Sequence, residues 1–563
     1  MSGKKILLML LPFWTPFVPP LGIACLKSYM KKYKFNIKTC DLNPEPEFWD
    51  IHNKYMEFLK KNIPVEKQGN VNTTGFDVLM THSLAYLNKQ EEKDYFHLLQ
   101  EMLFENFFYK IEIKHIHSLD SLVEKLYMHL ENHLDKIFAK EQPDVFGVSV
   151  FNSNLGPSLF ALKEFKKKKP GGITILGGGI LSDQLHPDSF NFKNILARMG
   201  ASIDKIVIGE GEVLLFKLLR GELPDNQKVF TIKDINNEVL DFTNVGVPDF
   251  GDFDLGKYPE LTSYASRSCP FQCKFCSETL QWGKYRKKKM KQVVDELIDL
   301  HKKYNYSLFL LGDSLLDPII MDLSREFISR GDILYWDGYL RVSDMAGNPG
   351  NAMLWRSGGF YRARLGIESG SERVLKLMDK KVTPHHIHST LKSLARAGIK
   401  TTTYWVTGYP GETEEDFQQT LDLIAQLKDY IFSAECHAFW FYPSGQVNSE
   451  KWVKEKGITP LYSEKLIRLL MLQSWVLNSE PRREEVHDRL FKFKDLCNRL
   501  DIPNPYNYAD WYHADERWKM LHKTAPPSML ELKQGNHQYN FIKESSTHSA
   551  AKEKFKIEGD YEF

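Results

Sequence analysis

The stretch SCPFQCKFC, residues 268–276, holds three of the seven cysteines in this chain of 563 residues. The spacing of Cys269, Cys273 and Cys276 lets one loop wrap three thiolates around a single compact metal centre. A closed structural zinc site needs four ligands, and no further Cys or His follows at a suitable short spacing. An iron–sulfur cubane held by three thiolates leaves one iron open for a substrate or cofactor. The spacing therefore predicts such a cluster, with three cysteines that bind no metal as the alternative.

The overall composition is that of a globular protein with several domains. Hydrophobic residues make up 42% of the chain and charged residues 26%. The formal net charge of +1 gives no indication of a nucleic-acid partner. The apolar stretch ILLMLLPFW, residues 6–14, is too short to cross a membrane and has no cleavage-site pattern, so it predicts a buried strand. We therefore expect a cytoplasmic protein with reduced thiols that binds neither membrane nor nucleic acid.

Around the cysteine stretch, strand-like and helix-like segments alternate through residues 261–445. Six strand-like segments separated by helical ones predict a partial (β/α)6 TIM-like barrel, with its chemistry at the carboxyl ends of the strands. These segments are YASRSC, SLFLLGD, ILYWDGYL, FYRARLGIESG, IKTTTYWVTGYPGE and ECHAFWFYP. Residues 446–563 form a C-terminal region that is helical in pattern and ends in a polar tail.

A second alternation fills residues 1–225. Its five strand–helix units predict a doubly wound parallel sheet, Rossmann-like, with a ligand crevice at the carboxyl strand ends. An insertion at about 45–140 has helical apolar periodicity and is expected to form a cap or a packing subdomain. Residues 226–260 are rich in Asp, Asn, Pro and Gly, which indicates a linker. The predicted fold class is therefore α/β, with this sheet followed by the barrel and the helical region.

The barrel segment resembles the radical S-adenosylmethionine (SAM) enzymes. Their signature is Cys-x3-Cys-x2-Cys with an aromatic residue before the last cysteine, and Phe275 fills that place. The stretches GIESGSERVLKLMDKK (366–381) and TGYPGETEEDF (407–417) resemble the fourth and fifth strand segments of that family. LLGDS (310–314) stands after the second strand, where the family binds the SAM amino group. The resemblance covers residues 260–445.

This resemblance implies one [4Fe-4S] cluster on the three cysteines, with SAM at the open iron. It also implies reductive cleavage of SAM to a 5′-deoxyadenosyl radical, with an external electron donor of the flavodoxin or ferredoxin type. The implied SAM contacts are Gly312, Asp313, Glu368, Ser369, Gly408, Pro410 and Gly411. Simpler alternatives are a helix N-cap for Asp313, a surface turn residue for Glu368 and a plain turn for the glycines.

The N-terminal sheet resembles the cobalamin-binding domain that precedes many radical SAM cores. The matching stretches are PPLGIACLKSYM (19–30), CDLN (40–43), PDVFGVSVFNSN (143–154), ILGGG (175–179) and VIGEGE (207–212). The implied cobalamin contacts are Ser149, Asn152, Asn154, Gly177, Gly178, Gly179, Gly209 and Glu210. Glycines at strand ends also serve helix–sheet packing, which is the alternative. The Asp-x-His-x-x-Gly motif that supplies a lower ligand to cobalt is absent, and the long insertion is a second departure.

Together these resemblances imply a methyltransferase that acts on an unactivated carbon, or phosphorus, of a small metabolite or peptide. The deoxyadenosyl radical would abstract a hydrogen atom, and methylcobalamin would supply the methyl group. A radical epimerase with Cys436 or Cys497 as hydrogen donor is one alternative. A cobalamin-dependent rearrangement or cyclisation is another, and a non-catalytic cobalamin or redox sensor is a third.

The catalytic residues are unknown from the sequence. The candidates are Cys436, His437 and Tyr404, which lie on predicted strands and for which core packing is the alternative. A tRNA methylthiotransferase needs a second cysteine triad in the N-terminal domain, which contains only Cys25 and Cys40. One cluster is therefore expected.

Overall fold

The computed structural model describes residues 3–331 and 334–534. The chain forms two compact units, and each is built from three separate stretches. Unit 1 comprises Met1–Lys257, Pro270–Tyr285 and Trp440–Ser479, and unit 2 comprises Tyr258–Cys269, Arg286–Phe439 and Glu480–Phe563. The sequence instead predicts four consecutive domains, at 1–225, 226–260, 261–445 and 446–563. Those domain bounds stay a prediction.

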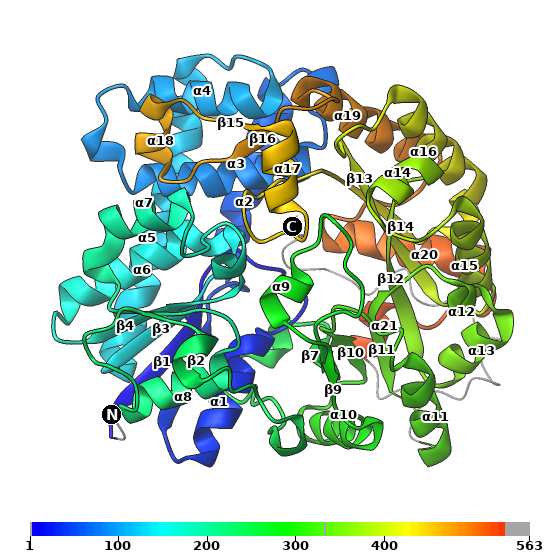
Figure 1. Ribbon diagram of the computed structural model, residues 1–563, viewed down its shortest axis with the longest axis horizontal. Coiled ribbons are helices and arrows are strands. Elements are labelled where there is room, and N and C mark those ends of the chain that lie inside the picture. Colours follow the sequence, from blue (N-terminus) through cyan, green and yellow to red (C-terminus); the bar gives the residue numbers. More distant parts are fainter. Residues whose placement is uncertain (1–2, 332–333, 535–563) are drawn as a thin grey trace. The chain divides into compact units, whose positions relative to one another are not determined.

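Unit 1 contains a parallel six-stranded sheet in the order β2-β1-β3-β4-β5-β6 (Figure 1). The strands are β1 (Lys5–Leu10), β2 (Asn36–Asp41), β3 (Val145–Ser149), β4 (Ile173–Gly177), β5 (Lys205–Val207) and β6 (Val229–Phe230). The strand order reverses between β1 and β3, which confirms the predicted doubly wound sheet. The short β6 lies in the segment predicted as a linker, and its two residues are too few to give a strand pattern.

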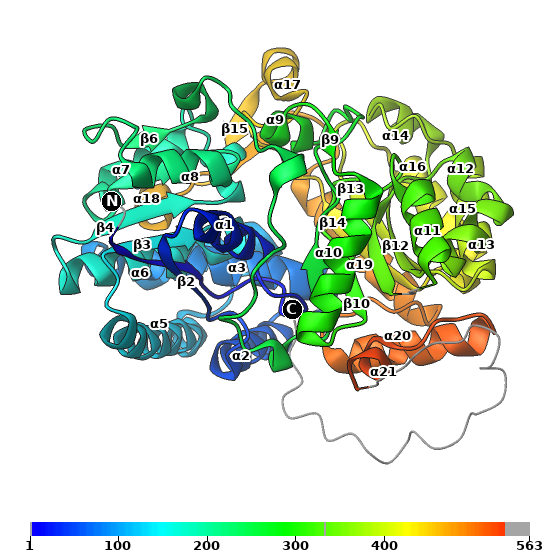
Figure 2. The same ribbon diagram turned by 90° about the horizontal axis from the view of Figure 1, so that it is seen from below.

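Helices cover both faces of this sheet because the right-handed crossovers run in opposite directions from β1 and β3. In Figure 2, α1 (Leu21–Lys32) and α8 (Gly211–Arg220) lie together on one face, and α5 (Ile113–Glu141) and α6 (Leu155–Lys168) lie together on the other. The central β1 is almost entirely buried, as expected for a strand covered on both sides.

The remaining elements of unit 1 include the predicted helical insertion, which spans α2 to α5. Their bounds are α2 (Pro46–Asn62), α3 (Val71–Tyr86), α4 (Tyr95–Phe107), α7 (Phe190–Met199), α9 (Glu278–Trp282), α17 (Ser449–Lys456), α18 (Glu464–Leu470), β15 (Ile458–Pro460) and β16 (Trp475–Leu477). No helix in residues 3–331 and 334–534 combines the length and apolarity needed to cross a membrane.

The insertion has a buried polar centre around Asp120. Its carboxylate accepts hydrogen bonds from Tyr95 Oη at 2.7 Å and Lys89 Nζ at 2.7 Å, and lies 3.2 Å from His82 Nε2. Burial by itself would raise the pKa of Asp120, but these donors outweigh it and lower the pKa to about 2. The ionised carboxylate therefore holds α3, α4 and α5 together.

Unit 2 contains a parallel sheet in the order β14-β13-β12-β11-β10-β7, so consecutive strands of the barrel are neighbours (Figure 1). This confirms the predicted partial barrel. The strands are β7 (Leu261–Ser263), β10 (Leu308–Leu311), β11 (Tyr335–Leu340), β12 (Phe360–Glu368), β13 (Lys400–Thr407) and β14 (Ser433–Ala438). An antiparallel pair, β8 (Ser266–Arg267) and β9 (Arg286–Lys287), follows β7.

The helices of unit 2 begin with clear sequence signals. Thr413 and Asp416 form a capping box at the start of α16, and Thr383 caps α15 just before Pro384. The helices are α10 (Met290–Tyr304), α11 (Ile320–Arg330), α12 (Asp344–Gly347), α13 (Pro349–Ser357), α14 (Glu372–Leu377), α15 (Pro384–Arg396), α16 (Glu414–Leu427), α19 (Arg483–Arg499), α20 (Tyr508–Leu521) and α21 (Met529–Gln534).

Candidate functional site

The cysteine loop begins at a strained residue and then makes a tight turn. Ser268 is fully buried with a left-handed φ of 74°, and the Cys276 amide donates to the Cys273 carbonyl at 3.0 Å. Cys273 is buried, and Cys269 and Cys276 are half-buried. No three His, Cys, Asp or Glu side chains in the described part of the chain are gathered closely enough to hold a metal ion, so the three-thiolate ligand set stays a prediction. Its support is the donor chemistry and spacing.

The second half of this loop is clamped by residues 446–448. Three successive carbonyls accept hydrogen bonds of 3.0 Å: Lys274 from the Asn448 amide, Phe275 from Gln446 Nε2, and Cys276 from the Val447 amide. Gln446 is buried, and its Nε2 also donates to the Trp440 carbonyl at 2.9 Å. Sequence reasoning missed Gln446, because no local pattern links it to a loop 171 residues earlier.

The glycine turn after β4 divides its three glycines between two roles. Gly178 has a φ of 128°, and a Cβ there would lie 2.2 Å from the Val150 carbonyl oxygen, so the turn itself requires glycine. A Cβ at Gly177 or Gly179 would meet only ordinary contacts at 3.6 and 3.4 Å. The turn therefore does not require glycine at positions 177 and 179. With glycine there, no side chain projects from the carboxyl edge of the sheet, which leaves room for a broad, flat cofactor.

The polar residues predicted to contact cobalamin also differ from one another. Asn154 is fully buried, and its amide bonds the Phe151 N–H and the carbonyls of Leu11 and Ser149. Its hydrogen-bonding capacity is therefore used within the fold. Asn152 is exposed, and Ser149 is half-buried in register with Gly177 on β4.

After β5, Gly209 is exposed with a φ of 92°, and a Cβ there would meet nothing within 4 Å. Glu210 accepts the Leu240 amide at 2.9 Å. Gly209 therefore leaves open space beside the sheet edge, while Glu210 anchors a neighbouring loop.

Unit 1 brings the glycine turn and the cysteine loop together. Helix α9, which follows Cys276, packs against the helical turn η4 (Gly179–Ser182), with Gln281 Nε2 3.9 Å from a Cβ built on Gly179. Gly445, the residue before the clamp, packs against the same turn. A Cβ built on Gly445 would lie only 2.7 Å from the Ser182 carbonyl oxygen. The two stretches predicted to hold different cofactors are therefore neighbours within one unit.

Two aromatic residues at the reversal point of the sheet were also missed. Trp14 and Phe151 stack with ring centroids 3.9 Å apart and planes 22° apart. They follow β1 and β3, the strands between which the order reverses, where ligands bind in such sheets. Their positions just after the first and third strands were the available signal.

In unit 2, the predicted SAM residue Asp313 is bonded inside the fold. Its carboxylate accepts the Ala265 amide at 2.9 Å and Ser266 Oγ at 2.5 Å, and burial raises its pKa to about 6. The Gly312 amide donates to the Ser263 carbonyl at 2.8 Å. Ser263 Oγ is buried and makes no hydrogen bond within the described residues, so this strand end has capacity for a polar ligand group.

Glu368 is the last residue of β12, and Ser369 follows it. Glu368 has a left-handed φ of 70° at a register irregularity, and its Oε1 accepts from Lys380 Nζ at 2.6 Å. Strained non-glycine residues of this kind gather at functional sites. Ser369 is fully buried and accepts the Ser371 amide at 3.1 Å, so it stabilises the turn.

The turn after β13 carries Gly408, Pro410 and Gly411. Gly408 and Gly411 have φ values of 83° and 92°, which only glycine adopts readily. The Gly408 amide donates to Glu412 Oε2 at 2.6 Å, and that carboxylate is paired with Arg489 at 2.9 Å. A buried ion pair therefore fixes the shape of this turn.

The three catalytic candidates lie on β13 and β14. Cys436 is buried, and burial holds its pKa well above the usual range. Strand alternation places His437 on the opposite face of β14, where its side chain is exposed. Tyr404 is half-buried, with its ring 6.0 Å from that of Tyr339.

The middle of the chain matches a known protein family. Residues 263–424 match the family model of the radical SAM superfamily. The class predicted from the cysteine motif, a radical SAM enzyme, is therefore confirmed.

Particular relatives extend the likeness beyond that segment. The chain is 27% identical over 331 residues to an uncharacterized methyltransferase of Pyrococcus horikoshii, covering 55% of this chain and 69% of the relative. It is 24% identical to an anaerobic magnesium-protoporphyrin IX monomethyl ester cyclase of Cereibacter sphaeroides, covering 65% and 63%. The fold is similar to that of the radical SAM methyltransferase TsrM from Kitasatospora setae, with a TM-score of 0.58, 15% identity and coverage of 94% and 98%.

Proposed function

We propose that this chain is a cobalamin-dependent radical SAM methyltransferase acting on an unactivated carbon or phosphorus of a small molecule or peptide. The main observation in support is that α9, just after the cysteine loop, packs against the glycine turn of the parallel sheet. Two relatives are named methyltransferases, and one of them was solved with tryptophan as substrate. An external flavodoxin or ferredoxin is the proposed electron donor.

The residues divide the work of holding these cofactors. Cys269, Cys273 and Cys276 would hold the cluster, while Gly177 and Gly179 would lie against the corrin. When bound, the cluster, SAM and cobalamin supply hydrogen abstraction and methyl donation. The chain itself binds and orients these groups.

In unit 2, some residues would contact SAM directly and others would stabilise the residues around it. Ser263 Oγ, which has unused hydrogen-bonding capacity, would bind a polar group of SAM. Glu368, oriented by Lys380, would accept a hydrogen bond from SAM. Asp313 would act indirectly, since it fixes the strand end that leads into the cysteine loop.

The test of the cluster is anaerobic reconstitution with iron and sulfide. We expect about four irons per chain and their loss in the variant with Cys269, Cys273 and Cys276 all changed to Ala. Retention of iron in that variant would show that the ligand assignment is wrong.

The test of cobalamin is gel filtration after incubation with hydroxocobalamin. The wild type should emerge with a corrin spectrum, and Gly177→Leu should lose it because the added side chain fills the room left at the sheet edge. Lys302→Glu, a surface change on α10, is the control for general damage. Wild-type protein that emerges without corrin overturns the methyltransferase proposal.

Cyclisation without methyl transfer is the second candidate, because relatives are named cyclases. Mass spectrometry of the product distinguishes the two, since methylation adds one CH2 unit and cyclisation adds none. Burial raises the pKa of both Cys436 and Cys497, so each thiol keeps the S–H form that hydrogen-atom donation needs, and a radical epimerase remains a further alternative.

A further inference from the structure

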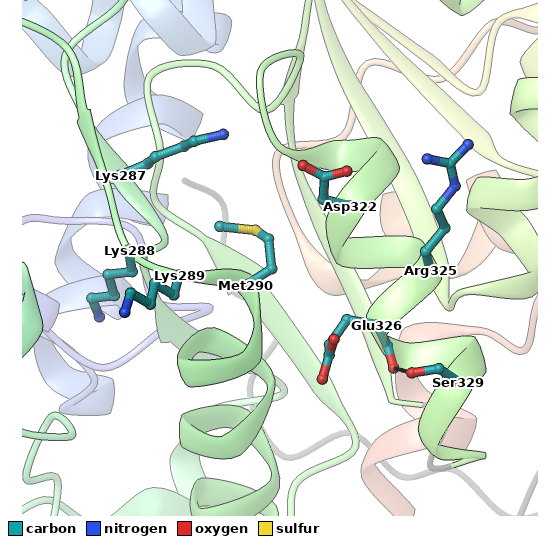
Figure 3. A pocket seen from close by; sticks show the side chains of 8 residues that line it. All are labelled: Lys287, Lys288, Lys289, Met290, Asp322, Arg325, Glu326 and Ser329. Atoms are coloured by element: carbon teal, nitrogen blue, oxygen red, sulfur yellow. Dashed lines mark hydrogen bonds between the residues drawn. The ribbon is translucent and has the colours of Figure 1, made fainter.

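A group of basic side chains lies at the start of α10 and on α11. We define the basic patch as Lys287, Lys289, Lys291 and Arg325, all exposed. Three of them border a hollow of about 700 Å³, whose lining residues are Lys287, Lys288, Lys289, Met290, Asp322, Arg325, Glu326 and Ser329. Figure 3 shows Lys287 pointing toward α11, which carries Asp322 and Arg325.

The charges of this patch are largely uncompensated. Lys289, Lys291 and Arg325 have no carboxylate partner among the described residues, and Lys287 Nζ reaches only the Pro318 carbonyl, at 3.4 Å. Lys288 differs, because its buried side chain pairs with Glu296 at 2.7 Å and is therefore structural.

Two carboxylates line the same hollow. Glu326 pairs with Arg330 at 2.7 Å, and Arg330 also pairs with Asp295 of α10, so one cation is shared by two carboxylates. Asp322 has no cationic partner among the described residues. The three unpaired cations of the lining still outnumber these acidic charges, so the hollow is net positive.

The patch is tied to the first cysteine through backbone pairing within unit 2. In the β8–β9 pair, Lys287 is opposite Ser266 and Arg286 is opposite Arg267. Cys269 follows Ser266 by three residues, which span at most roughly 10 Å. Asp313 holds Ser266 Oγ at 2.5 Å, so the pair is anchored to the barrel. A partner on the patch would thus sit beside the strand that leads into the predicted cluster loop.

We infer that the basic patch docks an acidic one-electron carrier protein of the flavodoxin or ferredoxin type. This inference rests on the proposed function. In the step it serves, the carrier loses one electron, the cluster gains one, and no bond forms or breaks. A nucleic acid fits less well, because the patch has only four cations and the chain as a whole has a net charge of only +1.

The experiment compares two charge reversals in the reconstituted holoenzyme. The test variant is Lys287→Glu with Lys289→Glu. The control is Lys302→Glu with Lys303→Glu, an equal change in charge at the exposed carboxyl end of α10. Stopped-flow absorbance follows cluster reduction by a purified flavodoxin hydroquinone, and separately by dithionite, which needs no protein docking. Calorimetry measures binding of oxidised flavodoxin.

At low salt, the test variant should be reduced by flavodoxin at least ten times more slowly than wild type, with binding weakened in proportion. Added salt should slow the wild type toward the variant. The dithionite rate should stay within twofold in every protein, and the control should behave as wild type.

Equal flavodoxin rates in test variant and wild type, with intact dithionite reduction, overturn the docking inference alone. Protein that holds no cluster, or none that dithionite reduces, overturns the proposed function instead. Binding of a 20-nucleotide RNA that Lys287→Glu with Lys289→Glu abolishes, with flavodoxin reduction unchanged, overturns the inference in favour of a nucleic-acid surface.

Discussion

Replacing Gly178 by alanine should unfold unit 1 at a much lower temperature. Gly178 has φ 128° and ψ 173°, a region that side-chain-bearing residues avoid at a cost of about 1–3 kcal/mol. The new Cβ would lie 2.2 Å from the Val150 carbonyl oxygen and 2.3 Å from its nitrogen. Both belong to backbone, so relief requires a shift of the β3 end, and overpacking of this kind costs about 1–3 kcal/mol.

The combined cost is about 2–6 kcal/mol, or a fall of roughly 4–12 °C in the midpoint of thermal unfolding. Circular dichroism measures that midpoint. Gly177→Ala is the matched control, because its Cβ meets nothing closer than 3.6 Å and its midpoint should fall by less than about 3 °C. Equal shifts in the two variants would refute this division of roles within the glycine turn.

Three further predictions concern other buried groups. Because the folded pKa of Asp120 is about 2, below its usual 3.8, its stabilisation is complete above pH 3.8 and is lost as the pH falls through 2. The unfolding midpoint should drop over that range by the equivalent of about 2 kcal/mol, and less in Asp120→Asn. Glu368→Gln should lower the free energy of unfolding measured in urea by about 2–4 kcal/mol, since it removes the carboxylate that pairs with the buried Lys380 cation. Glu368→Gln with Lys380→Met should recover most of this loss, and no recovery would mean that the pair is not the cause. Gln446→Ala removes the donor to the Phe275 carbonyl, so it should cost about 1–3 kcal/mol and speed iron release to a chelator, whereas unchanged release would exclude a clamping role.

The parts of the fold that depend on short-range pattern could be predicted from sequence. Alternation of apolar strands and amphipathic helices places both parallel sheets, and the glycine turn falls directly after a buried strand. The internal hydrogen bonds of Asp313 and Asn154 could not be predicted, because a polar residue after a strand can also bond the backbone of a distant segment. Their roles as cofactor contacts stay predictions. The hydrogen bond from Asn154 to the Leu11 carbonyl joins residues 143 positions apart, and no local sequence pattern indicates such a contact. The strand β6 was not predicted, because its two residues are too few to show the alternation of a strand.

The clamp at residues 446–448 has a consequence for biosynthesis. A ribosome makes about 5–20 residues per second, so the 171 residues between Phe275 and Gln446 take on the order of 10–30 s to appear. During that interval the cysteine loop has been translated but its anchor has not. We expect iron and sulfide to be inserted late, after release of nearly the whole chain, and a nascent chain stalled before Trp440 to retain no cluster.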